Sequence, residues 1–526
     1  MKFSAFDILS CFISICLNFY PENDVKAQQK TDTARFMVAT AHPIATKAGM
    51  EILKQGGNAF DAITASSFVL AVVEPSMSGI GGRLQAIFQK SNGEIGGVDA
   101  TTQVPFQYKP KAKEEENGFG TIGVPGMVKG ILELHTKYGK LPLKKVMAPA
   151  ILTAKNGFPI LREESLRFYS VLSELKKYAS TRENFLIKDT IPKNGDLFKQ
   201  AILANTLQKI ARDKGHSFYK GKLAQNLSEQ ITLGGGPLSF EDMQRYEAEN
   251  GKILKGNYRG FEIMALGMPS YGAIAIEMLH LLEHENLSTT SEFEFLMHHA
   301  NAHKKAYEDR KLLKTNEDLL VEKSYALSRW TDSSKTIVSK PEDARNGHTT
   351  HLVASDSMGN IVSVTQSLGP IMGSKVASEN GYMLATTMGP YLGSMKAGER
   401  ASSHIAPVLV LKNGIPILAL GAAGGARIVP AVVQVISRFI DQKMSLEQAV
   451  AAARIFHLGD RIQIENHDQV YWKESTTLQS FQKQKILYTE IKQPAQFGRV
   501  HAIQRLPSGL WIGAADPDWT GSAGYY

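Results

Sequence analysis

The sequence predicts an α+β fold in which layers of helix and sheet enclose a shared core. The chain has 526 residues, of which 43% are hydrophobic and 21% charged, as is ordinary for a globular protein. Helical patterns dominate up to about residue 330, and alternating strand patterns dominate after about residue 348. Length alone suggests two or more domains. The order of the patterns instead favours packed layers, because helices and sheets cover each other's apolar faces.

Helices are expected before and after the first strands. Residues 42–57 carry apolar side chains at helical spacing and end in a glycine pair, which is typical of a helix C-terminus. A buried helix is expected to begin at Asn58 and to stop at Pro75, since proline cannot continue a helix. The pattern from Pro125 to Trp330 is again mostly helical.

Three hairpins are expected, each made of two strand-like runs joined by a short turn. Their turns are Ser91-Asn92-Gly93, Ser357-Met358-Gly359 and Asn413-Gly414. The paired runs are residues 84–90 with 94–101, 350–356 with 360–367, and 407–412 with 416–421. Helices over residues 427–440 and 445–456 follow the third hairpin.

The charge distribution excludes some classes of partner. The net charge is +8 and the pI about 9.1, but no long basic run or basic-aromatic interleaving is present, so nucleic acid is not an expected partner. A mildly basic surface can still steer anionic substrates. Beyond the N-terminal segment, no apolar run is long enough to span a bilayer.

Residues 1–27 resemble a secretory signal, with an early lysine, an apolar run over residues 8–17 and "VKA" before Gln28. This predicts a periplasmic or secreted protein; the alternative is an N-terminal extension on a cytoplasmic one. The two cysteines, Cys11 and Cys16, lie within this segment. Its removal would exclude disulfides, thiol catalysis and cysteine-ligated metals together.

Several familiar site motifs are absent or incomplete. His299 and His303 are four apart on one helix, but Ala300 stands where a zinc protease would have its glutamate. "GIGG" and "GAAGGARI" match neither phosphate-binding nor dinucleotide-binding spacing. The serine-hydrolase motif G-x-S-x-G does not occur. We therefore expect neither a metal nor a cofactor.

The stretch "NGHTTHLVASDSMGNIVSV" contains the threonine pair Thr349-Thr350 at the start of an expected strand. Threonine is common in strands, and the local pattern alone favours that simple role. A threonine can act as a nucleophile when a base takes its proton, and an N-terminal threonine carries its own α-amine. Thr349 would need a cut between His348 and Thr349 to gain that amine.

The surrounding blocks decide between these two interpretations. They include "GMEILKQGGNAFDAITASSFVLAVVEPSMSGIGG", "GTIGVPGMVKGILELHTKYGKLPL", "GGGPLSFEDMQRYEAE", "GNYRGFEIMALGMPSYG", the threonine stretch, "GAAGGARI" and "AADPDWTGSAGYY". In this order they resemble the γ-glutamyltransferase (γ-glutamyltranspeptidase) family over nearly the whole chain. The resemblance implies a four-layer αββα sandwich of the N-terminal nucleophile hydrolase type. It also implies self-cleavage into a large subunit, residues 28–348, and a small subunit, residues 349–526, which remain together as a heterodimer.

The same resemblance implies roles for individual residues. Thr349 would be the nucleophile and, through its α-amine, the base, and Thr350 would orient it by hydrogen bonding. Ser367 stands where the family usually has a second threonine. Gly424 and Gly425 match the family's oxyanion glycines, whose backbone N–H groups can approach a developing charge closely.

The donor pocket matches the family only in part. Ser402 and Ser403 match the serine pair that holds the donor's α-carboxylate, but Thr101 replaces the arginine expected there. Gly369 replaces an asparagine, and Thr387 stands at a donor-binding position in a block that normally ends in acidic residues. Loss of an arginine–carboxylate contact and of an acidic partner for an ammonium should weaken α-amino acid donors.

Three functions therefore stay open. The first is a γ-glutamyltransferase-like enzyme that transfers or hydrolyses glutathione-type γ-glutamyl amides or peptides. The second is a same-fold acylase for a different amide, glutaryl-like or oxamate-like, in which Arg83 or Arg400 supplies a replacement charge. The third is an inactive family member, which the retained Thr349, Ser367 and glycine pair disfavour.

Overall fold

A computed structural model describes residues 34–110, 115–331, 348–393, 395–493, 496–518 and 520–525. The predicted signal segment, with both cysteines, lies outside the described residues. So does the polar segment 332–347 that precedes the predicted cleavage site.

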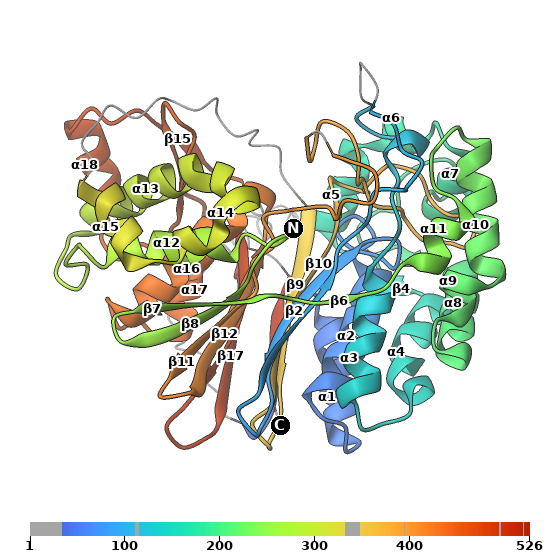
Figure 1. Cartoon of the computed structure of the whole chain (residues 1–526), viewed down its shortest axis with the longest axis horizontal. Helices are drawn as coiled ribbons and strands as arrows, with labels where there is room; N and C mark the ends of the chain where they lie inside the picture. Colours follow the sequence, from blue (N-terminus) through green and yellow to red (C-terminus); the bar gives the residue numbers. More distant parts are fainter. Residues whose placement is uncertain are drawn as a thin grey trace, which may run out of the picture. The chain divides into compact units, whose positions relative to one another are not determined.

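Two large sheets form the centre of the molecule (Figure 1). The order of the seven-stranded sheet is β18 (Ser522–Tyr525), β1 (Met37–Thr40), β9 (His348–Ser355), β10 (Ile361–Gly369), β2 (Arg83–Gln89), β3 (Ile95–Ala100) and β6 (Glu249–Asn250). The order of the six-stranded sheet is β17 (Trp511–Ala515), β16 (Arg499–Arg505), β12 (Ile415–Ala423), β11 (Val408–Lys412), β8 (Phe261–Leu266) and β7 (Ile253–Tyr258). Neighbouring strands in both sheets run antiparallel.

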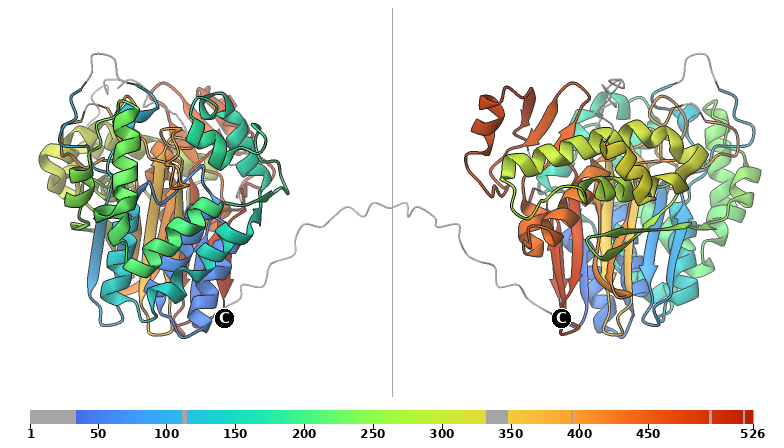
Figure 2. Two further views of the ribbon diagram at one scale, coloured as in Figure 1. Left: turned by 90° about the vertical axis from the view of Figure 1, so that its right-hand side faces the viewer. Right: turned by 60° about the vertical axis from the view of Figure 1, so that its left-hand side comes forward.

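Helices cover the outer face of each sheet, as Figures 1 and 2 show. The seven-stranded sheet is covered by α1 (Pro43–Lys54), α2 (Ala59–Val73) and α3 (Met127–Tyr138), and further helices of the same layer include α4 (Leu143–Asn156), α8 (Ala201–Asp213) and α10 (Lys222–Leu233). The six-stranded sheet is covered by helices that include α12 (Gly272–Leu282), α13 (Glu292–Asp309), α16 (Ile428–Ile440) and α17 (Leu446–Ala451).

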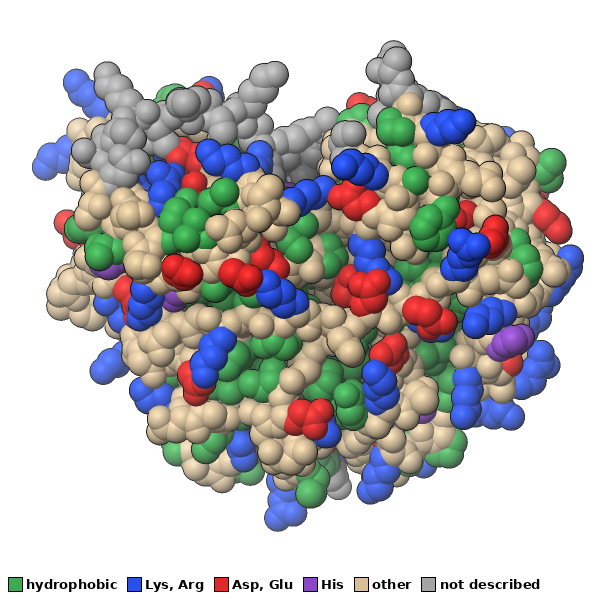
Figure 3. Space-filling view, viewed as in Figure 1, with side chains coloured by type: hydrophobic (Ala, Val, Ile, Leu, Met, Phe, Trp, Pro, Cys, Tyr) green, Lys and Arg blue, Asp and Glu red, His purple; other side chains and the backbone are tan. Residues whose placement is uncertain are grey.

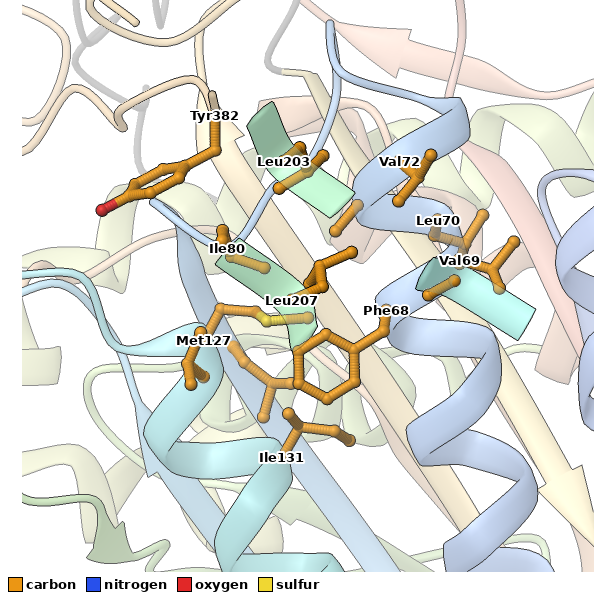
Figure 4. Close-up of a cluster of buried hydrophobic side chains, with 14 of the residues drawn as sticks. Phe68, Val69, Leu70, Val72, Ile80, Met127, Ile131, Leu203, Leu207 and Tyr382 are labelled. Carbon is orange, nitrogen blue, oxygen red and sulfur yellow. The ribbon is translucent and has the colours of Figure 1, made fainter. Parts of the chain in front are cut away.

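The core is divided by the same layers. Successive side chains of a strand point to opposite faces, so each sheet contributes to an inner and an outer cluster. Met37, Val353, Leu409 and Ile503 belong to the cluster between the sheets. The outer cluster over the seven-stranded sheet contains Phe68 and its neighbours from α2, α3 and α8 (Figure 4). This helix–sheet–sheet–helix order confirms the predicted αββα sandwich.

The helix α2 shows why the sequence folds this way locally. Asn58 caps it reciprocally with Asp61 in a capping box. Every residue of α2 is buried, which explains its lack of a polar face. The helix ends at Glu74, one residue before Pro75, as the sequence predicts.

The three predicted hairpins are present as β2–β3, β9–β10 and β11–β12. The predicted helix over residues 445–456 is wrong in its second half. It ends at Ala451, and β13 (Ile455–His457) pairs with β14 (Ile462–Glu465) in a small third sheet completed by β15 (Tyr488–Ile491). The ladder satisfies the backbone groups of Ile455–His457, which a continued helix would otherwise have paired.

The surface in Figure 3 mixes lysine and arginine with aspartate and glutamate, and neither sign forms a continuous stripe on that face. Among the described residues, no helix combines the length and apolar character needed to cross a bilayer.

Two histidines between the sheets make stability depend on pH. His351 of β9 and His501 of β16 are fully buried, and burial lowers the pKa of His501 from 6.5 to about 4. At a pH between about 4 and 6.5, His501 is protonated in the unfolded chain but not in the folded chain. The free energy of unfolding therefore falls as the pH drops below 6.5. Urea unfolding should show a loss of about 2 kcal/mol from His501 alone at pH 5 relative to pH 7.5. His501→Gln should flatten this dependence; an unchanged slope in that variant would contradict the assignment.

Candidate active site

Thr349 lies near the start of β9 and is 3% exposed. It pairs across the ladder with Ser367 of β10, which pairs in turn with Arg83 of β2. Paired residues of antiparallel strands point to the same face. Val353 of β9 and Ile361 of β10 point into the space between the sheets. Because every second residue of a strand points to the same face, Thr349 and Ser367 point into that space as well. Thr349, Ser367 and Arg83 therefore form a row of side chains at one end of the space between the sheets.

The Ser367 hydroxyl connects Thr349 to the peptide bond that precedes it. Thr349 Oγ1 donates a hydrogen bond to Ser367 Oγ at 3.1 Å, and Ser367 Oγ donates to the His348 carbonyl oxygen at 2.8 Å. The Gly369 N–H donates to the same Ser367 oxygen at 2.9 Å. The ladder shifts register between Ser367 and Gly369, which frees this N–H for the hydroxyl. Two hydroxyls and the carbonyl of the predicted cleavage site thus form one hydrogen-bonded chain.

Thr350 points to the opposite face of β9. Its hydroxyl donates to a carboxylate oxygen of Glu74 at 2.7 Å, and both residues are buried. Glu74 is the C-cap residue of α2, so this hydrogen bond joins the start of β9 to a rigid helix end. That contact fits the orienting role expected of Thr350.

We expect Thr350→Val to destabilise the protein, because it leaves a buried Glu74 oxygen without this donor. The free energy of unfolding should fall by about 1–3 kcal/mol, as measured by urea denaturation. Thr64→Val is the matched control, since it removes a buried hydroxyl that donates only to the Phe60 carbonyl within α2. An equal decrease in the free energy of unfolding in both variants would show that the hydrogen bond to Glu74 stabilises the protein no more than an ordinary buried hydroxyl does.

The peptide bond before Thr349 lies among buried cations. The pKa of His348 is held well below its usual value, first by burial and then by the positive charges of Arg167, Arg499 and Lys375. Its imidazole is therefore neutral at physiological pH. Burial also lowers the pKa of Lys375 to about 8. Arg167 is paired with Glu164 at 2.7 Å, so part of this charge is balanced.

Gly424 and Gly425 form the turn that directly follows β12. Their φ angles of 142° and 59° are positive, which strongly favours glycine. The preceding residue, Ala423, pairs with Arg499, and Arg499 is one of the charges acting on His348. The glycine turn therefore lies at the same end of the sandwich as Thr349.

Thr101 and Thr387 are fully buried. The Thr387 hydroxyl has no hydrogen-bond partner among the described residues, whereas the Thr101 side chain interacts with the Asp99 carboxylate. Thr101 directly follows Ala100, which pairs with Leu84, so it lies at the same end of the sheet as Arg83. A buried hydroxyl without a partner is unfavourable, which makes Thr387 a candidate for contact with a bound molecule.

Ser402 and Ser403 lie in the loop before β11. Ser402 is partly exposed, and Ser403 Oγ is buried without a hydrogen-bond partner in the described structure. The N–H of the neighbouring Ala401 donates to the Thr102 carbonyl at 2.9 Å. The serine loop and the Thr101 segment are thus held side by side.

Arg400 does not supply a replacement charge. Its guanidinium lies 2.9 Å from Glu249 and 3.7 Å from Asp99, and it donates to the Tyr246 hydroxyl at 3.2 Å. The charge of Arg400 is already balanced by these two carboxylates.

The histidine pair of α13 is used in packing. The His299 ring lies 4.5 Å from the Phe295 ring, and His303 Nδ1 accepts a hydrogen bond from the His457 N–H at 3.1 Å. A different group, Glu465 with His467 and Asp518, brings ligand-type atoms together among the described residues. Arg454 binds Glu465 at 2.8 Å and neutralises part of that charge.

Sequence reasoning did not identify Glu74, Arg167, Arg499 or Lys375 as neighbours of the site. Only Glu74 carries a local signal, since it is an acid that directly follows the apolar run over residues 68–73. The other three reach the site through long-range packing, which has no local signature.

Comparisons with known proteins show the family to which the chain belongs. The family described as Gamma-glutamyltranspeptidase matches residues 45–526. A "Glutathione hydrolase proenzyme" from Bacillus subtilis is 31% identical over 475 residues, which covers 80% of each chain. An "Acylase ACY 1 proenzyme" from Pseudomonas is 29% identical and covers 94% of each chain.

A solved structure of cephalosporin acylase from Bacillus halodurans superposes with a TM-score of 0.86 at 25% identity, covering 98% of this chain and 99% of that one. Together with the matched sandwich, these similarities mean that the chain belongs to the gamma-glutamyltranspeptidase family of N-terminal nucleophile amidohydrolases and acyltransferases.

Proposed function

We propose that the chain cuts itself between His348 and Thr349. Thr349 Oγ1 attacks the His348 carbonyl carbon, and its proton passes to Ser367 while Ser367 gives its own proton to the carbonyl oxygen. Collapse of this intermediate re-forms the carbonyl, passes its hydroxyl proton to the Thr349 nitrogen and breaks the C–N bond, which leaves His348 as an ester on the Thr349 oxygen and frees the Thr349 α-amine. Water then hydrolyses the ester, which frees the carboxylate of His348 and the hydroxyl of Thr349. The hydrogen-bonded chain from Thr349 through Ser367 to the His348 carbonyl supports this step most directly.

The freed Thr349 then carries out acyl transfer. Its α-amine takes the hydroxyl proton, the hydroxyl attacks a substrate amide, and an acyl-enzyme forms as the amine leaves. The N–H groups of Gly424 and Gly425 stabilise the oxyanion. Water or an acceptor amine releases the acyl group. No metal or cofactor is required by these steps.

The first candidate donor is a γ-glutamyl amide of the glutathione type. Family membership and the relative named glutathione hydrolase support it, as do Ser402 and Ser403 in the loop beside Thr101. The large and small subunits, residues 28–348 and 349–526, would remain together as the working enzyme.

The second candidate donor is a non-glutamyl amide. Thr101 and Thr387 offer hydroxyls instead of the charged groups that an α-amino acid requires, and relatives named acylase cover nearly the whole chain. The rates at which the purified enzyme hydrolyses γ-glutamyl-, glutaryl- and oxamoyl-p-nitroanilide would rank the two candidate donors. If a cleaved enzyme releases p-nitroaniline from none of these amides, both candidates are contradicted.

We also propose that export removes residues 1–27. Recovery of the protein from the periplasm or medium with Gln28 as its first residue is the expected result. A cytoplasmic protein that retains Met1 or Lys2 would contradict the proposal.

A further inference from the structure

Arg83 is an arginine buried beside the predicted nucleophile. It is 1% exposed and lies in the same row as Thr349, with Ser367 between them. Adjacent strands are about 4.8 Å apart, so the Cα atoms of Arg83 and Thr349 are roughly 10 Å apart across two strand spacings. The side chain of Arg83 shares the inter-sheet face with Thr349.

The guanidinium has few partners for so buried a cation. Nη2 donates to the Thr386 carbonyl, Tyr391 interacts electrostatically with the cation, and Nε has no hydrogen-bond partner among the described residues. Nor does any described carboxylate lie within 4 Å of it. Burial lowers the pKa of Arg83 to about 10, so it remains charged at neutral pH. A buried cation without a counter-charge is costly to keep, which points to an anion that arrives from outside the chain.

Gly369 lies beside this guanidinium. A Cβ atom at Gly369 would lie 3.5 Å from Arg83 Nη2 and 3.3 Å from the Tyr391 ring. The N–H of the same glycine donates to the Ser367 hydroxyl, which accepts the hydrogen bond from Thr349. Because glycine has no side chain, the space next to Arg83 Nη2 is not filled from this position.

The surroundings of Arg83 disfavour an ammonium group. The nearby Thr386 and Thr387 carry buried hydroxyls without partners in the described structure, and neither brings a negative charge. An ammonium close to Arg83 would meet like charge in a buried setting. The site therefore suits a carboxylate that has no amine on the neighbouring carbon.

We propose that Arg83 binds a carboxylate on the acyl part of the substrate, and that the preferred donors are monoamides of short dicarboxylic acids. The proposal rests on the acyl-enzyme proposed at Thr349. Of the two candidate donors named for that enzyme, it favours the non-glutamyl amide. The short distance across two strands limits the acyl chain to a few carbons between the reacting carbonyl and the carboxylate.

The test compares isosteric donors on the cleaved enzyme. Succinyl- and glutaryl-p-nitroanilide carry the carboxylate, their ω-carbamoyl analogues replace it with a neutral amide, and γ-glutamyl-p-nitroanilide adds the α-amine. For the unmodified enzyme, kcat/KM should be about 10²-fold higher for the carboxylate than for the carbamoyl donor. The kcat/KM for the γ-glutamyl donor should be lower than that for the better of the succinyl and glutaryl donors.

Variants then separate a binding role from a purely structural one. Arg83→Met should lower kcat/KM far more for the carboxylate donors than for the carbamoyl donors, so that the carboxylate preference is lost. Arg83→Lys should keep part of the preference, since it keeps the charge without the planar fork. Arg461→Met is the control, because Arg461 is exposed and paired with Asp460.

Three results would overturn the proposal: no carboxylate preference in the unmodified enzyme, equal slowing of both donor types in Arg83→Met, or γ-glutamyl as the best donor. The first and third need no variant, so they decide even if Arg83→Met does not fold. An uncut chain that cleaves no donor would instead overturn the proposed function itself.

Discussion

Thr349→Ala is expected to give a single uncut band on a denaturing gel, where the unmodified chain gives two fragments split before residue 349. The substitution removes the hydroxyl that is linked through Ser367 to the His348 carbonyl. Amide hydrolysis should fall by about 10³-fold or more, because the nucleophile and its α-amine are lost together.

Thr349→Ser is the matched control, since it keeps the hydroxyl and loses only a methyl group. It should still be cut and should retain measurable hydrolysis. Cleavage of Thr349→Ala at the same bond, shown by mass spectrometry of the fragments, would refute the assignment of Thr349.

Ser367→Ala is expected to slow self-cleavage by about 10²-fold or more, as for loss of one oxyanion donor. This variant removes both the acceptor for the Thr349 hydroxyl and the donor to the His348 carbonyl. Cleavage should be followed over time on gels after purification of the uncut chain. Ser367→Thr should restore most of the rate because it restores the hydroxyl.

Ser363→Ala provides a second comparison on the same strand and face. Ser363 is buried and donates to the Leu420 carbonyl at 3.2 Å, and it makes no hydrogen bond to Thr349 within the described structure. It should change stability by about 1 kcal/mol and leave the cleavage rate close to normal. Equal slowing in the two alanine variants would mean that Ser367 acts only through packing.

Part of the site follows from local sequence. The turn around Met358 sets the register of the β9–β10 hairpin, because residues equally distant from the turn pair with each other. That rule alone places Ser367 opposite Thr349, as the structure has it. The turn residues thus predict the contact between the two hydroxyls without any knowledge of the rest of the fold.

Other parts of the site could not be predicted in this way. Arg83 follows a glycine run in the sequence, and nothing local shows that its side chain is buried without a counter-charge. Glu74 reaches Thr350 across 276 positions of sequence. Such contacts depend on how distant segments pack in the sandwich. The strand at Ile455–His457 depends on long-range pairing too, because its ladder with β14 forms in place of the helix that the local sequence favours.

The order of strands in the seven-stranded sheet has a consequence for the cut enzyme. β1 comes from before residue 348 and lies between β18 and β9, while β10 pairs with β2, so strands from the two sides of the predicted cut are interleaved in the sheet. Once cut, the two pieces cannot part without breaking ladders in the centre of the sheet. Refolding then requires two molecules to meet, whereas folding before the cut requires one. The melting temperature of the cut enzyme should therefore rise with protein concentration, and that of an uncut variant should not.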